Sequence, residues 1–280
     1  MSFRPPHRST VTASSHPFDR AMRLKTVDAG TVRGATDPEW ANMVGPFGGI
    51  TAAVLLRAVE SHPDRIGDPL ALTVNFAAPI TDGAFEICLR AARTNRSNQH
   101  WLLELRQDDE VKTTATALFG LHRDTWADDE SRPPSVTAPE EVEPGSFVDA
   151  IVWAKRYDMR FTDGPVPLGA GEPSPSSTTT LWVRDAQDRM LDFAALACLS
   201  DVFFPRVFLR RGRFLPAGTI TLTTYFHVDH SEIDAVGSDY LLASAHANRF
   251  SRGYFDQSAH LWSRAGRLLT STHQLVYFKD

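Results

Sequence analysis

LTVNF (72–76) and LTTYF (222–226) decide how this chain of 280 residues folds, because they are two copies of one pattern. Each lies inside a longer run in which apolar and polar residues alternate, LALTVNFAAPI (70–80) and TITLTTYFHV (219–228). Alternation with a period of two predicts a β-strand with one face against the core. The two copies therefore predict corresponding strands in two similar halves.

The surroundings of these strands repeat as well. Each strand is preceded by a segment that is apolar around most of its circumference, which predicts a buried helix. These segments are ITAAVLLRAVESH (50–62) and LDFAALACLSDVFF (191–204), and we expect Pro205 to end or bend the second one. Each strand is followed by a region with the pattern of further antiparallel strands, at 84–119 and 240–278.

The two halves also agree in register. An offset of 150 residues relates Phe76 to Phe226, and an offset of 159 residues relates Phe119 to Phe278. A helix followed by an antiparallel meander, occurring twice, is the pattern of the hotdog fold. We therefore predict an α+β tandem double hotdog, in which each half is an antiparallel sheet wrapped around a long central helix. The alternative is two unrelated α+β segments that look alike by chance.

Composition divides the chain into parts. The first 18 residues contain no acid and lack the apolar core of a secretory signal, so we expect a flexible N-terminal tail at 1–24, with a transit peptide as the alternative. We expect an N-terminal hotdog at 25–121, an acidic and Pro-rich linker at 122–146, and a C-terminal hotdog at 147–280. The stretch 164–180 has a similar composition and is expected to be a surface loop or a flap.

Charge and cysteine content limit the function. The formal net charge is −5 and the sequence pI is about 6.1, which argues against a general nucleic-acid-binding protein. Cys88 and Cys198 lie in apolar runs without metal-site spacing, and we expect them to be buried thiols of a cytoplasmic protein. No apolar stretch is long enough to span a bilayer. The sequence contains no nucleotide-binding or zinc-protease motif, so we predict no cofactor and no metal.

A comparison of the two predicted helices identifies Asp201. The first helix has no acid between Gly48 and Val59, whereas the second carries Asp201 within an apolar run. Burial and a position in the last helical turn both disfavour a carboxylate, so we expect a raised pKa suited to a general base. The alternative is an acid that caps a turn or pairs with Arg206 or Arg210.

Two polar residues on separate predicted strands could act with Asp201. Thr219 heads its strand, on the face expected to carry Thr221, and its alternative explanation is ordinary β-propensity. Gln274 lies in the last strand, where the repeat places Ala115 in the first half. A buried glutamine needs partners for both ends of its amide. Together, an aspartate, a hydroxyl and an amide could hold and polarise one water molecule.

Several stretches match a known family. In the second half they are YDMRF (157–161), LWVRD (181–185), SD (200–201), GTI (218–220), YFH (225–227) and LLTSTHQ (268–274), and in the first half PFGG (46–49), FAAPITDG (76–83), RTNRS (93–97) and VKTTATALFG (111–120). On these stretches the chain resembles the bacterial acyl-CoA thioesterase II family and its peroxisomal relatives. The resemblance extends over nearly the whole chain after about residue 30.

This resemblance has functional implications. It implies hydrolysis of acyl-CoA thioesters to free acid and CoA, with the family's catalytic Asp, Thr and Gln at Asp201, Thr219 and Gln274. It also implies an acyl-CoA partner and a homo-oligomer. The chain departs from the family at Ala78-Pro79-Ile80, where Arg-Pro-Gly is common, and this departure affects chain-length preference and CoA contacts.

The implied mechanism is attack by water on the thioester carbonyl. Asp201 would deprotonate the water with help from Thr219 and Gln274, and backbone N–H groups at a helix start would stabilise the oxyanion. Gly48-Gly49 is the candidate for close backbone approach to the substrate, with a tight turn into the helix as the alternative. A covalent serine route is disfavoured because the chain lacks a GxSxG elbow.

Two other functions stay open at this point. A hotdog enoyl-CoA hydratase would need a histidine close to its acid, and the first histidine after Asp201 is His227. A non-catalytic acyl-CoA-binding protein would keep the fold without the chemistry. The run from His227 to His230, HVDH, could suggest a metal site, but strand alternation favours a solvated strand end.

Overall fold

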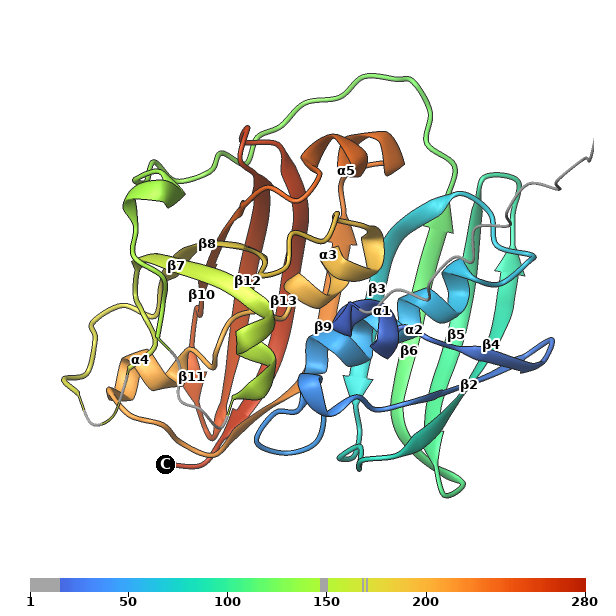
Figure 1. Ribbon diagram of the computed structural model, residues 1–280, viewed down its shortest axis with the longest axis horizontal. Coiled ribbons are helices and arrows are strands. Elements are labelled where there is room, and N and C mark those ends of the chain that lie inside the picture. Colours follow the sequence, from blue (N-terminus) through green and yellow to red (C-terminus); the bar gives the residue numbers. More distant parts are fainter. Residues whose placement is uncertain (1–15, 147–150, 168, 170) are drawn as a thin grey trace, which may run out of the picture.

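One continuous antiparallel sheet extends through both halves of the molecule (Figure 1). The computed structural model describes residues 16–146, 151–167, 169 and 171–280. The sheet has 13 strands in the order β1-β2-β4-β5-β6-β3-β9-β13-β12-β10-β8-β7, with β11 paired to β12. Its strands are β1 (Lys25–Asp28), β2 (Thr31–Ala35), β3 (Asp68–Phe76), β4 (Ala84–Thr94), β5 (Asn98–Gln107), β6 (Glu110–Gly120), β7 (Tyr157–Asp163), β8 (Thr179–Asp185), β9 (Ala217–Phe226), β10 (Leu241–His246), β11 (Phe250–Ser251), β12 (Tyr254–Ser263) and β13 (Leu268–Phe278).

The two halves meet where β3 pairs with β9. These are the strands that carry LTVNF and LTTYF, and their register places Thr73 directly opposite Thr223. The two hydroxyl oxygens lie 3.0 Å apart. Because the offset of 150 residues relates the same two threonines, an approximate two-fold axis passes between them. The α+β double hotdog predicted from the repeat is therefore confirmed.

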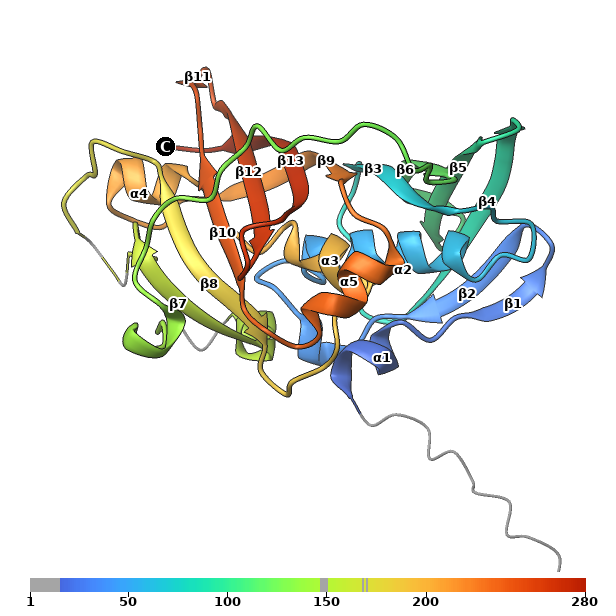
Figure 2. The same cartoon turned by 90° about the horizontal axis from the view of Figure 1, so that it is seen from above.

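Two helices lie on the same side of this sheet, where β3 and β9 meet (Figure 2). Helix α2 (Gly48–Glu60) is buried over most of its circumference, and it packs against α3 (Phe193–Leu199). The prediction of a helix over 191–204 was too long, because α3 ends at Leu199. The apolar residues after Leu199 are buried in a turn. Their apolar character was the reason that the sequence predicted a longer helix.

The described N-terminal residues correct the predicted tail. Helix α1 (Pro17–Ala21) packs its Phe18 edge-to-face against Trp40, and both rings are buried. His16 caps this helix and bonds to Asp185 of β8. The prediction of a flexible tail at 1–24 is therefore wrong from His16 onward, and residues 1–15 lie outside the described part. A few apolar residues sufficed to anchor a segment whose composition resembled disorder.

The connection between the halves runs across the molecule from β6 (Figure 1). Between 122 and 146 it contains only the short 3-10 helix η2 (Pro139–Glu141). The Trp182 indole donates to the carbonyl oxygen of Thr137 at 2.8 Å, and Arg264 pairs with Glu140, so the later part is held against the second half. We propose 122–146 as the linker between two hotdogs at 25–121 and 147–280, of which residues 147–150 are not described.

The remaining helices are short. They are η1 (Pro38–Trp40), η3 (Val152–Arg156), α4 (Val207–Arg211) and α5 (His230–Val236). Within the described residues, no helix combines the length and apolar character needed to cross a membrane.

Candidate active site

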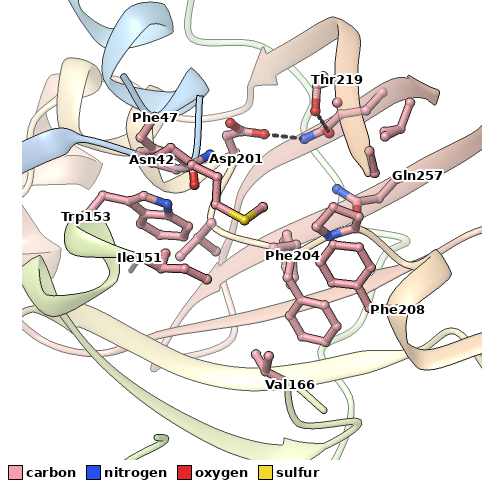
Figure 3. Close-up of a pocket in the computed structure, with 18 of the residues that line it drawn as sticks. Asn42, Phe47, Ile151, Trp153, Val166, Asp201, Phe204, Phe208, Thr219 and Gln257 are labelled. Carbon is pink, nitrogen blue, oxygen red and sulfur yellow. Dashed lines mark hydrogen bonds between the residues drawn. The ribbon is translucent and has the colours of Figure 1, made fainter. Parts of the chain in front are cut away.

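Three separate elements bring Asp201, Thr219 and Gln274 together. Asp201 lies in the turn after α3, Thr219 near the start of β9, and Gln274 in the middle of β13. The Gln274 amide donates from Nε2 to Asp201 Oδ1 at 2.8 Å, and its Oε1 accepts from the Thr219 hydroxyl at 3.2 Å (Figure 3). The two ends of one buried amide therefore connect the acid to the hydroxyl.

A β-bulge places Thr219 on the inner face of the sheet. Leu275 pairs with Thr221 but Val276 pairs with Thr219, so Ile220 is the extra residue on β9. An extra residue reverses the direction of the next side chain. The prediction that Thr219 shares a face with Thr221 is wrong for this reason, and Thr219 instead faces the same side as buried Val276.

Burial controls the ionisation of Asp201. Removal of this carboxyl from water raises its pKa from 3.8 to about 7, while hydrogen bonds from the Gln274 amide and the Gly49 backbone partly lower it. Neither Arg206 nor Arg210, the predicted alternative partners, bonds to it. The expected raised pKa is present, and its main cause is burial; the predicted position in the last helical turn is wrong, because α3 ends at Leu199.

The two glycines at the start of α2 fit closely around this turn. A Cβ atom at Gly48 would lie 2.6 Å from Asp201 Oδ2, and one at Gly49 would lie 2.4 Å from the carbonyl oxygen of Cys198. Gly48 also lines a cleft at the site, whereas Gly49 bonds to Asp201 through its backbone. Side chains at these positions would push the carboxylate or separate α2 from α3.

Two cavities meet at Asp201 and Thr219. The first, which we call the aromatic pocket, is lined by Phe47, Ile151, Trp153, Phe161, Val166, Phe203, Phe204, Phe208, Phe214, Gln257 and Gln274 (Figure 3). The second, which we call the open cleft, is lined by Val44, Pro46, Gly48, Thr51, Phe76–Ile80 and Tyr277. Both cavities also include Asn42, Met43, Ala217 and Gly218. An extended ligand could therefore pass the acid with one end in each cavity.

Other predicted features lie away from this junction. Asp229 caps α5 rather than continuing the strand, and its side chain accepts from the Glu232 backbone. In the described part of the chain, no group of three His, Cys, Asp or Glu side chains is arranged to hold a metal ion. Cys198 is buried and bonds to the Tyr157 hydroxyl, and burial holds the pKa of its thiol far above the ordinary range.

The sequence reasoning missed Gln257, which lines the aromatic pocket opposite Gln274 in the β12–β13 register. A signal was present in the repeat. The first-half pair Leu103 and Ala115 occupies the corresponding position in β5 and β6 and is apolar. A strand-by-strand comparison of the halves would have shown that both residues of the pair became amides.

Comparison with known proteins agrees with the architecture. Residues 130–278 match the model of an acyl-CoA thioesterase C-terminal domain, and residues 36–120 match that of an acyl-CoA thioesterase N-terminal domain. No match was found among curated proteins.

Solved structures with the same fold were also found. A hot dog fold protein of unknown function from Alicyclobacillus acidocaldarius is 45% identical with a TM-score of 0.91, and the match covers 95% of this chain and 99% of that one. A putative thioesterase II from Thermobifida fusca YX is 20% identical over 94% and 97% of the two chains, with a TM-score of 0.79. The acyl-CoA thioesterase II TesB2 from Mycobacterium marinum is 17% identical over 94% and 98%, with a TM-score of 0.73.

Proposed function

The chain belongs to the acyl-CoA thioesterase family, and from this premise we propose that it hydrolyses acyl-CoA thioesters with a water molecule activated by Asp201, Thr219 and Gln274. Membership makes the protein a thioesterase enzyme. The assignment of the three residues is supported by the hydrogen-bonded chain from Asp201 through Gln274 to Thr219, which is the observation that carries the proposal.

The amide of Gln274 fixes the geometry of the proposed site. An ionised carboxylate only accepts hydrogen bonds, so Gln274 must turn its Nε2 toward Asp201 and its Oε1 toward Thr219. The Thr219 hydroxyl then donates to Gln274 and keeps its lone pairs for a proton of the water. The same water donates its other proton to Asp201, which leaves an oxygen lone pair for the thioester carbonyl.

Asp201 has the ionisation behaviour that this role requires. A general base is most effective when its pKa lies near the working pH, and burial raises the pKa of this carboxyl to about 7. Asp201 takes the proton as water attacks, and the tetrahedral intermediate then expels the CoA thiolate. A thiol of pKa about 8.5 is a good leaving group and needs little acid assistance.

The two cavities accommodate the two ends of the substrate. We assign the acyl group to the aromatic pocket, because aromatic and other apolar side chains make up most of its lining. We assign the pantetheine arm of CoA to the open cleft, which reaches the backbone at Ala77 and Ala78. The thioester then lies at the junction beside Asp201 and Thr219. The N-terminus of α2 at Gly48 faces the same junction and is the proposed source of oxyanion stabilisation.

The two alternative functions find less support. Among the described residues, neither cavity is lined by a histidine, which the proposed hydratase chemistry would need. A protein that only binds acyl-CoA would not need the buried carboxylate of Asp201, because burial of this group lowers the stability of the folded state. The cytoplasmic location and the homo-oligomeric state stay predictions.

Release of free thiol from acyl-CoA tests the proposal. Purified protein at pH 8 should release CoA from acyl-CoA, and Asp201→Asn should slow the release by about 10²- to 10⁴-fold. Asp163→Asn removes an exposed carboxyl at the end of β7 and serves as the charge-matched control with unchanged activity. Tight binding of acyl-CoA without thiol release would support the binding protein instead, and full activity in Asp201→Asn would remove this residue from the mechanism.

A further inference from the structure

Gln257 lines the aromatic pocket, and the proposed hydrolysis does not use its side chain. Gln257 is 1% exposed, and its Nε2 is buried without a hydrogen-bond partner in the described structure. A buried donor without a partner is costly, and such groups are rare in folded proteins. Figure 3 places Gln257 beside Phe204 and Phe208, on the side of the pocket where Thr219 lies.

Arg206 fixes the orientation of this amide. The Arg206 side chain is fully buried and donates from Nε to Gln257 Oε1 at 3.0 Å. A guanidinium can only donate, so the carbonyl end of Gln257 must face Arg206 and the Nε2 end must face away from it. Arg206 does not line the pocket, whereas Gln257 does. The free donor is therefore the end of the amide that faces away from Arg206, on a residue that lines the pocket.

Arg206 itself is held firmly and pairs with no carboxylate of the described residues. Its other hydrogen bonds go to Thr179 Oγ1 at 2.5 Å and to the carbonyl oxygens of Phe204 and Ser177. Its guanidinium also lies 4.2 Å from the ring centre of Phe204. A buried cation polarises the Gln257 amide, which strengthens the free N–H as a donor.

The register places this donor close to the reacting carbonyl. Gln257 pairs directly with Gln274 across β12 and β13. The Cβ atoms of directly opposite residues are about 4.5–5.5 Å apart, and both of these side chains point to the inner face. Gln274 positions Asp201 and Thr219, the two residues that hold the proposed nucleophilic water, so the first few carbons of a bound acyl chain lie nearest to Gln257.

We propose that Gln257 Nε2 donates a hydrogen bond to an oxygen on the acyl group close to the thioester, so that the enzyme prefers 3-oxo- or 3-hydroxyacyl-CoA to unsubstituted acyl-CoA. This inference rests on the proposed hydrolysis and identifies its substrate class. An unsubstituted chain would leave this donor unpartnered, whereas a carbonyl or hydroxyl oxygen at the third carbon satisfies it. We expect kcat/KM to favour the oxygenated substrate by about ten- to a hundredfold.

The test compares hexanoyl-CoA, 3-oxohexanoyl-CoA, 3-hydroxyhexanoyl-CoA and adipoyl-CoA by thiol release. The proposal expects a preference for one or both of the 3-substituted substrates. Equal kcat/KM for all four would overturn this inference alone, whereas no thiol release from any of them would overturn the proposed hydrolysis. A preference confined to adipoyl-CoA, whose carboxylate lies at the far end, would overturn the placement of the oxygen near the thioester.

Gln257→Glu is the informative variant, because a carboxylate still accepts from Arg206 but cannot donate when ionised. The proposal expects this variant to lose the preference, because its kcat/KM falls further on the 3-substituted substrates than on hexanoyl-CoA. Equal losses on every substrate would assign Gln257 to the shared machinery, such as an oxyanion donor, and an unchanged preference would make it purely structural; both outcomes overturn the proposal. Gln257→Met serves as a second variant, and the wild-type comparison decides the matter if neither variant folds.

Discussion

Replacement of Asp201 by Asn should stabilise the folded protein while it lowers activity by about 10²- to 10⁴-fold. The buried carboxyl has a pKa raised from 3.8 to about 7, so its ionisation is disfavoured in the folded state. One pKa unit corresponds to about 1.36 kcal/mol, so the carboxylate costs about 4 kcal/mol of stability above pH 7. Asparagine has no charge to bury, and its carbonyl oxygen can still accept from the Gln274 amide.

The sign of this effect depends on pH. Below pH 3.8 the carboxyl is protonated in both the folded and the unfolded protein, so its raised pKa has no effect on stability. As pH rises toward 7 the unfolded protein releases a proton that the folded protein retains, and wild-type stability falls. Relative to wild type, Asp201→Asn should therefore gain about 2.5 kcal/mol between pH 5 and pH 8.

Urea unfolding at several pH values measures this difference. The free energy of unfolding of each protein is extrapolated to water at pH 5, 6, 7 and 8, and the Asp163→Asn control, whose carboxyl is exposed, should follow the wild type. A difference between Asp201→Asn and wild type that does not change with pH would refute the reasoning. It would mean that Asp201 ionises equally easily in the folded and unfolded states.

Four further predictions follow from the same geometry. For wild-type enzyme, kcat/KM should rise with pH through an apparent pKa of about 7, because the proposed base must be ionised; a flat pH-rate profile would contradict this. Gly48→Ala should lower kcat by at least about tenfold, since its Cβ would displace the Asp201 carboxylate, whereas Gly171→Ala has room and should be active. Thr219→Val should reduce kcat by about 10- to 10³-fold with little change in melting temperature, and wild-type activity would show that the hydroxyl has no role. Phe18→Ala should lower the free energy of unfolding in urea by about 3–5 kcal/mol, because α1 is anchored through this ring. An unchanged urea midpoint would show instead that this segment is flexible, as the sequence had predicted.

The repeat made most of the fold predictable. Strand alternation and two corresponding helices were enough to find β3, β9 and the meanders that follow them, because both halves bury the same face. The outer strands β7 and β8 were not predicted from their patterns. β8 is buried along most of its length and so shows no alternation.

The site was predictable in composition but not in geometry. Asp201 was conspicuous as an acid in an apolar run, and Gln274 because the repeat has Ala115 in its place. The position of Thr219 on the inner face depends on a bulge at Ile220, which arises from pairing with β13 and leaves no local signal. The partner of Gln257, buried Arg206, was likewise invisible because tertiary packing alone brings them together.

Isotope labelling in a single turnover tests the role of Asp201 most directly. Excess enzyme is mixed with acyl-CoA in water enriched in ¹⁸O, and both the released acid and the peptide that contains Asp201 are analysed by mass spectrometry. If Asp201 deprotonates a water that attacks the thioester, the acid carries one ¹⁸O atom and the Asp201 carboxyl carries none. Unlabelled acid, or ¹⁸O in the Asp201 carboxyl, would show that this residue attacks the carbonyl itself and would contradict the mechanism.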